Sequence, residues 1–564
     1  MEIHEPLELY ATTFESEHLR LVEETFDGLA EASKVDIEAN RQTVANLNAT
    51  ESELKGNKTT NFWWQALRVV LILASAGCAF MAYYAQNWIW LLGTAAPWPV
   101  IIFVLNGIIR DSNAVIAGLE SRRNQLRNDA WRQMMPLNQS HDWYQAHRLV
   151  MQTLPDIQFE HIFTSQRMAE LQSNFGWSDR WGTNKSVTCV QSALLFGSPI
   201  VLAQYVYHWM GSKQYSGSLR ISWTEQVKDS NGNWKTETRS ETLTAYVTKP
   251  FPEYRDSGEV IHGHDLVPHL SFSRKPNGAA NKGLLGKLAL GWNKSAIKGK
   301  ARKTKGGFVP LENQDFDATF NAVDRSDETA FRVMFTALAQ RQMLLLLQDK
   351  EVGYGDDFAF SKSGMVTKIE PSHLTGIDLS CNPALLQHYD FDAARAMFVN
   401  YHMNFFKGMY FAIAPLLAIP EYQIGCAYRA TDTSGTGPAT WELEAVANHH
   451  GDATFAHPQC VTKSILKTQH IIDADGVVTA EVTAYGYMGI PRTDYVSVKG
   501  GDGHYHDVAV HWTEYIDVNR SSSMTVVDTH DSVLGNMWQA SLAAQGISAD
   551  SATLYKSLRS VVGG

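Results

Sequence analysis

The sequence predicts a membrane α-helical hairpin with flanking amphipathic helices, followed by a large α+β soluble domain with antiparallel β-hairpins. Three observations predict this fold. The stretch 62–109 is apolar along its length and holds one charged residue, Arg68. Residues 14–56 before it contain no proline and show helical spacing of apolar residues. Beyond residue 183, β-branched and aromatic residues alternate with polar ones between turn signals, which is typical of strands.

Composition limits the class of protein. A chain of 564 residues is too long for one core, so we expect about two to four folded units. The formal net charge of −11 argues against a general nucleic-acid binder. The five cysteines include no CxxC pair, which is typical of a reducing compartment. The expected segments are a helical arm at 1–61, a two-span hairpin at 62–109, a helical arm or linker at 110–182 and an α+β domain at 183–564, with room for two subdomains.

The N-terminal arm reads as one or two long amphipathic helices. Leu19, Val22, Phe26 and Leu29 follow the 3–4–3 spacing of one helix face. Such a face either packs against another helix of the same chain or forms a coiled coil with a partner protein. Because heptads are not sustained, we favour packing within the chain.

The apolar stretch is long enough for two spans. A bilayer core of about 30 Å needs roughly 20 apolar residues per helix, so 62–109 fits two helices and a short turn. Trp63 and Trp64 begin the first span at the depth where aromatic rings favour the headgroups. Pro97 and Pro99 either kink the second span or begin it. The alternative is a buried helical hairpin in a soluble protein, against which length, aromatic belts and missing charge all argue.

Basic residues flank the hairpin on both sides, and the connecting turn at 85–87 has none. They are Lys55, Lys58, Arg110, Arg122, Arg123 and Arg127. The positive-inside rule therefore places both arms, both termini and the large domain in the cytoplasm. The arm after the hairpin, 111–175, is expected to be helical, with breaks near Pro136 and Pro155, and to pack antiparallel on the first arm.

Residues 187–210 carry no formal charge and have two interpretations. A third membrane span would move the large domain to the outside. We favour two strands, because Gly197-Ser198-Pro199 lies in the middle and the flanking residues alternate or are β-branched. Helices are then expected at 328–349 and 391–419, strands from 479 onward, and a final helix at about 536–562.

A basic segment at 274–306 holds ten basic residues and no acidic one. Either it is a solvated glycine-rich loop, or its apolar residues insert between lipids while its lysines contact anionic headgroups or a protein partner. Nucleic acid is a weaker alternative. The candidate membrane or partner contacts are Lys287, Trp292, Lys294, Lys298, Lys300, Arg302, Lys303 and Lys305.

Histidines offer the only weak candidates for a metal site. His262, His264 and His269 lie within eight residues, and the first two would share one face of a strand. Zinc needs three or four converging ligands, and surface or core histidines explain the group more simply. The sequence therefore predicts no cofactor, with zinc as the alternative.

Function follows from these features. We expect an integral membrane protein whose large cytoplasmic domain acts as a scaffold, assembly or interaction component at the inner membrane surface. An enzyme is disfavoured because the chain lacks P-loop, HExxH and GxSxG motifs. The alternative is a membrane-tethered metal-dependent hydrolase. The expected partners are the bilayer and either anionic lipid or a protein; a homo-oligomer stays open.

Overall fold

The computed structural model describes residues 3–86, 89–178, 182–228, 233–278, 280, 293, 311, 313–433, 436–474, 477–528 and 552–562. The chain divides into two compact units. The larger consists of Met1–Leu19, Trp143–Asn382 and Met403–Gly564, and the smaller of Arg20–Asp142 and Pro383–His402. This division differs from the expected segments in three places. Residues 1–19, expected in the N-terminal arm, belong to the large unit. Residues 143–182 belong to the large unit, and residues 383–402 join the helical one.

Long helices make up the smaller unit. Asp36 caps the N-terminus of α3 by accepting a hydrogen bond from the Ala39 N–H at 2.9 Å. The apolar stretch and the polar arms form continuous helical runs, so the arms lead directly into the apolar segments. The elements are α2 (Glu15–Ser33), α3 (Ile37–Ala85), α4 (Ile89–Ala95), α5 (Pro97–Pro99), a π-helical segment (Val100–Leu105) and α6 (Asn106–Asn138).

The two prolines lie inside the second helical run, not at its start. Helical structure begins at Ile89, before Pro97 and Pro99, and the six residues after them are π-helical. Proline removes a backbone donor, so a local change of helix type at this position is its expected effect.

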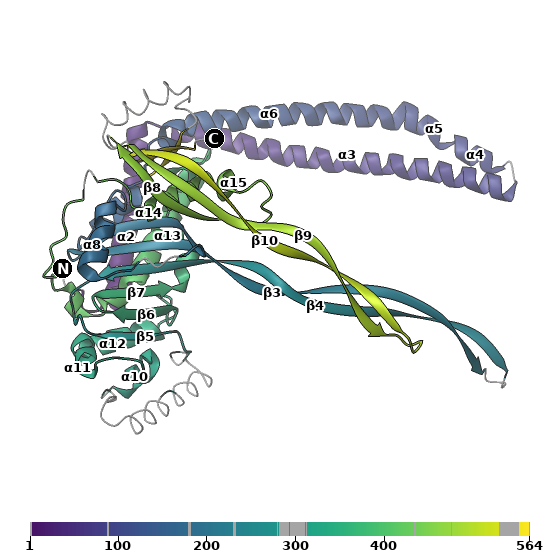
Figure 1. Ribbon diagram of the computed structural model, residues 1–564. Helices are drawn as coiled ribbons and strands as arrows, with labels where there is room; N and C mark the ends of the chain where they lie inside the picture. Colours follow the sequence, from purple (N-terminus) through teal and green to yellow (C-terminus); the bar gives the residue numbers. More distant parts are fainter. Residues whose placement is uncertain are drawn as a thin grey trace. The chain divides into compact units, whose positions relative to one another are not determined.

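The helices α3 and α6 lie side by side, as Figure 1 shows, and this confirms the expected pairing of the two arms. Leu47 and Leu54 of α3 are buried, as are apolar side chains of α6. Gln133 Nε2 donates to Thr43 Oγ1 at 3.0 Å. At the other end of the pair, Asn61 Nδ2 donates to Asn113 Oδ1 at 2.8 Å.

Helix α13 (Phe391–Leu417) contributes residues to both units. In the helical unit, Phe26 of α2 packs against Phe391 and Phe398, with ring centroids 5.5 and 5.3 Å apart. In the large unit, residues 403–417 are mostly buried, and Tyr410 donates to the Pro6 carbonyl at 2.7 Å. The prediction of a helix at 391–419 is confirmed, with its end at Leu417.

Two antiparallel sheets form the large unit within the described residues. One has the order β1-β2-β3-β4-β7-β6-β5 and the other β11-β12-β10-β9-β8. The strands of the first are β1 (Ile157–Phe159), β2 (Lys185–Leu195), β3 (Ser198–Lys228), β4 (Trp234–Gly263), β5 (Ser271–Arg274), β6 (Phe358–Ser363) and β7 (Val366–Pro371). Those of the second are β8 (Ile465–Ala474), β9 (Val477–Lys499), β10 (Tyr505–Asp528), β11 (Thr553–Tyr555) and β12 (Leu558–Val562). The β2–β3 hairpin confirms that 187–210 forms strands.

Helix α14 (Thr440–His450) lies in the main core, among apolar side chains from both sheets. Its Trp441 belongs to the same buried cluster as Val187 and Val201 of the first sheet and Val482 and Val526 of the second. The remaining helices are α1 (Pro6–Leu9), α7 (Gln145–Thr153), α8 (Ser165–Phe175), α10 (Gln314–Phe320), α11 (Glu328–Met334), α12 (Ala337–Gln348) and α15 (Asp452–Phe455), with short π- or 3₁₀-helical turns at Tyr10–Phe14, Ser372–Gly376, Pro383–Leu386 and Pro420–Gln423.

Two helix predictions need correction. The expected final helix is wrong from residue 553, where β11 and β12 form instead; residues 529–551 lie outside the described part of the chain. The reason is pairing at long range, since β12 aligns with β10 from Met524↔Val562 to Asp528↔Leu558. The single helix expected at 328–349 is two helices, because Thr336 accepts from the Ala339 N–H and starts a new one.

Two long hairpins, β3–β4 and β9–β10, extend from the sheets and cross each other (Figure 1). Strand β3 has 31 residues, which at 3.3 Å each corresponds to about 100 Å. At the crossing, Ile221 and Leu243 of one hairpin pack with Val508 and Val510 of the other. The Gly501 N–H also donates to Glu241 Oε2 at 2.7 Å.

Gly217 sets how closely the hairpins approach. A Cβ at this position would overlap the Ala509 carbonyl oxygen of β10. We therefore expect Gly217→Val to separate the hairpins at a cost of about 1–3 kcal/mol, measured as faster amide hydrogen exchange in Leu219–Ile221 and Val508–Val510. Ser218→Val is the matched control, because Ser218 is exposed and points to the opposite face. Equal exchange in the two variants would contradict the prediction.

Candidate functional site

The apolar ends of the paired helices form the first part of the candidate site. Within the described residues, two helical runs, Ile37–Tyr84 and Ile89–Asn138, are long and apolar enough to cross a membrane by length and composition. In the most apolar 18-residue window of each run, only 6% and 17% of the window is buried inside the structure. A core helix of a soluble protein buries most of such a window, so these helices expose an unusual amount of apolar surface.

The exposed side chains are large. Phe103 is 82% exposed, Phe80 66% and Leu73 64%, whereas Leu47 and Leu54 in the polar arm are buried. The same pair of helices therefore turns its apolar residues inward in the arms and outward in the apolar segments. This reversal is what a bilayer requires, because lipid and not protein solvates apolar side chains there.

Polar groups inside the apolar segments are hydrogen-bonded between the two helical runs. Ser75 Oγ donates to the Thr94 carbonyl at 2.7 Å, and Trp98 Nε1 donates to Ser75 Oγ at 3.2 Å. Hydroxyl and indole N–H groups without a partner are costly away from water. These bonds fix the pairing of the helices at the level of Ser75, one of the few buried residues of the segment.

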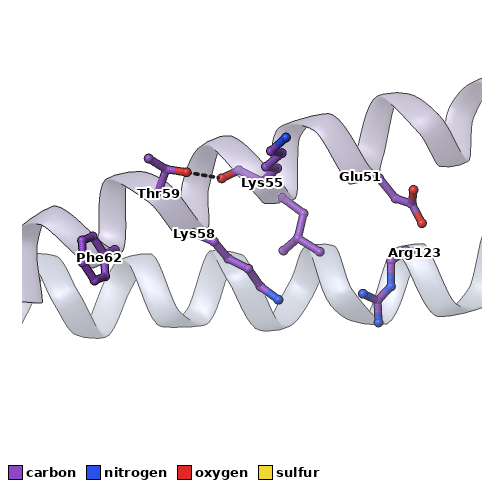
Figure 2. Close-up of a pocket in the computed structure, with 7 residues that line it drawn as sticks. Glu51, Lys55, Lys58, Thr59, Phe62 and Arg123 are labelled. Atoms are coloured by element: carbon purple, nitrogen blue, oxygen red, sulfur yellow. Dashed lines mark hydrogen bonds between the residues drawn. The ribbon is translucent and has the colours of Figure 1, made fainter.

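A pocket of about 470 Å³ lies between α3 and α6, next to the start of the apolar segment. Figure 2 shows Lys58 extending from α3 toward α6, which carries Arg123. Lys58 Nζ lies 2.6 Å from Glu120 Oε1, and this contact lowers the pKa of the Glu120 carboxyl. Seven side chains line the pocket: Glu51, Leu54, Lys55, Lys58, Thr59, Phe62 and Arg123.

Sequence reasoning used Lys55, Lys58 and Arg123 for orientation and missed that they share a pocket. The antiparallel pairing of the two arms was the available signal, since it brings the residues before the first apolar helix beside those after the second. A local sequence pattern could not predict the pocket, because Lys58 and Arg123 are far apart in the sequence.

The basic segment is the second predicted site. Its candidate contacts lie outside the described residues, so their prediction stays untested: Lys287, Trp292, Lys294, Lys298, Lys300, Arg302, Lys303 and Lys305. At its start, Arg274 is buried and forms an ion pair with Asp356. Asp357 accepts a hydrogen bond from His373 Nδ1 at 2.6 Å. These two carboxyl groups therefore link the residues before β6 to β5 and to the turn Ser372–Gly376.

The predicted histidines lie near the end of β4. His262 and His264 are buried, with ring centroids 5.7 Å apart, and both rings pack against Tyr422. His269 is exposed. Burial lowers the pKa of His262 well below its usual value, with His264 and Lys362 adding to the effect. Among the described residues, no group of three His, Cys, Asp or Glu side chains is placed to hold a metal ion.

Comparisons of this chain with protein families, with curated proteins and with solved structures find no match.

Proposed function

We propose that this chain is an integral membrane protein, anchored by a two-span hairpin at 62–109, whose large unit acts as a scaffold, assembly or interaction component at the inner membrane surface. The observation that carries the proposal is the outward-facing apolar surface of the two helical runs, where windows long enough to span a bilayer are hardly buried. Satisfied polar groups at Ser75 and Trp98 support it, because unpaired ones would be costly in lipid.

The long hairpins support an interaction role. Residues 233–242, which comprise the first part of β4 and the residue before it, are all exposed. The aromatic side chains of Trp234 and Tyr246 in this strand are 66% and 58% exposed. Tyr495 and Tyr505 of the other hairpin are 70% and 71% exposed. A two-stranded ribbon that extends beyond its sheet is marginally stable by itself. Exposed aromatic side chains on such ribbons are typical of surfaces that bind a partner protein.

Orientation completes the proposal. The basic residues on both sides of the hairpin favour cytoplasmic arms, and the large unit follows them. The basic segment at 274–306 is then available to anionic lipid or a protein partner on the same side of the membrane. No observation favours the metal-dependent hydrolase, so we do not propose it.

Topology mapping in cells tests this function. We would place single reporter cysteines at Asn87 and Ser216 in a cysteine-free background, confirm that the protein stays with the membrane fraction in alkaline carbonate, and label intact cells with an impermeant thiol reagent. We expect labelling at position 87 and protection at position 216, because the connecting turn faces outward and the large unit inward. Labelling after permeabilisation at both positions is the control for thiol reactivity.

The other outcomes separate the parts of the proposal. Release by carbonate would remove the membrane anchor altogether. Labelling at 216 with protection at 87 would reverse the orientation and place the large unit outside. Either result would overturn the cytoplasmic scaffold.

A further inference from the structure

The pocket between α3 and α6 has features of a lipid headgroup site. We propose that it binds one anionic phospholipid, whose phosphate contacts Lys58 and Arg123 and whose glycerol and upper acyl chain lie against Phe62. This inference rests on the proposed membrane function and adds a specific partner for one site.

Charge is the first argument. The lining side chains include three cations, Lys55, Lys58 and Arg123, and one anion, Glu51. Glu120, which pairs with Lys58, adds a second anion. The net charge of these five side chains is still positive, in a chain whose net charge is −11. Arg123 hydrogen-bonds the neutral Asn124 side chain at 2.8 Å and also acts electrostatically on the Glu120 carboxylate that Lys58 binds. A guanidinium binds a phosphate through two parallel N–H groups.

Depth is the second argument. Lys58 lies four residues before Phe62, which corresponds to about 6 Å along a helix. The headgroup layer on each side of a bilayer is about 5–8 Å thick. Arg123 belongs to α6, which runs away from the apolar segment, so its side chain leans back toward that segment. Because Glu120 of α6 pairs with Lys58, Arg123 lies three residues, or about 5 Å, farther from the apolar segment than Glu120. The Lys58 side chain leans away from that segment and the Arg123 side chain leans back toward it, so the two cations meet at the outer edge of the headgroup layer if the span begins at Phe62.

The apolar lining is the third argument. Leu54, which lines the pocket, is buried, whereas Phe62, about two turns farther along α3, is 64% exposed and begins the apolar surface. The pocket thus joins a cationic rim to an apolar surface that continues along the helices. A free phosphate would use only the rim, whereas a phospholipid has a matching polar and apolar part, so we commit to the lipid.

Lipid retention by the full-length protein tests the inference. The protein is reconstituted in nanodiscs of phosphatidylcholine and phosphatidylglycerol, extracted gently, and the retained lipids are counted by native mass spectrometry. We expect the wild type to retain phosphatidylglycerol preferentially, and Arg123→Gln to lower that preference about five-fold, as the loss of one cation near a membrane surface implies. Arg123→Lys should keep part of the preference, because lysine retains the charge but lacks the paired N–H groups.

Arg122→Gln is the matched control. It removes the same charge from the adjacent position, but Arg122 is exposed and does not line the pocket. Equal retention by wild type and Arg123→Gln, or an equal loss in both glutamine variants, would overturn the lipid site while leaving the membrane anchor intact. Displacement of phosphatidylglycerol by excess inorganic phosphate would overturn the choice of a lipid. Failure of the wild type to enter nanodiscs would instead overturn the proposed function.

Discussion

Replacing Lys556 with Met is expected to destabilise the large unit by about 3–5 kcal/mol, the usual cost of breaking a buried ion pair from one side. Lys556 Nζ lies 2.8 Å from Glu442 Oε1, and the two side chains are 2% and 0% exposed. Lys556 also donates to the Val190 carbonyl at 2.6 Å, and Glu442 accepts from the Phe163 N–H at 2.7 Å. The pair therefore ties the C-terminal strands to α14 and β2.

The pKa of Glu442 explains the size of this effect. Burial raises the pKa of the Glu442 carboxyl, and the Lys556 ammonium opposes that rise. Without Lys556, the carboxylate is buried and uncompensated, so it must either stay charged at high cost or take up a proton. The measurement is chemical unfolding of the full-length protein in detergent at pH 7.5.

Two further variants make the result specific. The double variant Lys556→Met/Glu442→Gln should recover most of the loss, because glutamine still accepts from the Phe163 N–H and no charge stays buried. Arg239→Met is the control at an exposed ion pair, since Arg239 and Glu225 are 50% and 48% exposed. We expect a change of less than about 1 kcal/mol there. A loss of similar size in Arg239→Met and Lys556→Met would contradict the prediction.

Acid is expected to destabilise the large unit between pH 7.5 and pH 5.0, by about 2 kcal/mol through His147 and by a further amount of the same sign through His262. Burial lowers the pKa of His147 to about 3, with Lys556, His161 and Arg148 adding to the effect. Burial also lowers the pKa of His262 well below its usual value. Neither ring nitrogen of His262 has a hydrogen-bond partner within the described residues.

The sign follows from proton binding. An unfolded histidine takes up a proton below about pH 6.5, whereas the buried one stays neutral in the folded state. Their contribution is therefore fully present above pH 6.5 and is lost as the pH falls toward the folded-state pKa. At pH 5.0 His147 costs about 2 kcal/mol, because its folded-state pKa of about 3 lies below that pH and one pH unit corresponds to 1.36 kcal/mol. His262 adds a loss of the same sign.

His262→Leu isolates one half of this effect. The variant should have a smaller stability difference between pH 7.5 and pH 5.0 than the wild type, whatever its stability at pH 7.5. His269→Gln is the control, because His269 is exposed near the end of the same strand. An unchanged pH difference in His262→Leu would show that His262 does not govern the acid response.

Local patterns in the sequence determined several elements correctly. The apolar stretch 62–109 forms long exposed helices, residues 187–210 form a strand pair, and the region from 391 forms a long helix. These features depend on a period or on a turn signal within a few residues, so neighbours in the chain carry the information. The same logic predicted that the apolar faces of the two arms would pack together.

The tertiary structure alone decided the rest. Residues 553–562 form strands because β10, distant in the sequence, offers a paired edge, although the local pattern favours a helix. Phe391 and Phe398 belong to the helical unit because their rings pack against Phe26 and bury its apolar surface. The pocket beside Phe62 exists because antiparallel pairing brings Arg123 near Lys58. Each of these depends on contacts between distant segments, and the free energy of such contacts appears in no local window of the sequence.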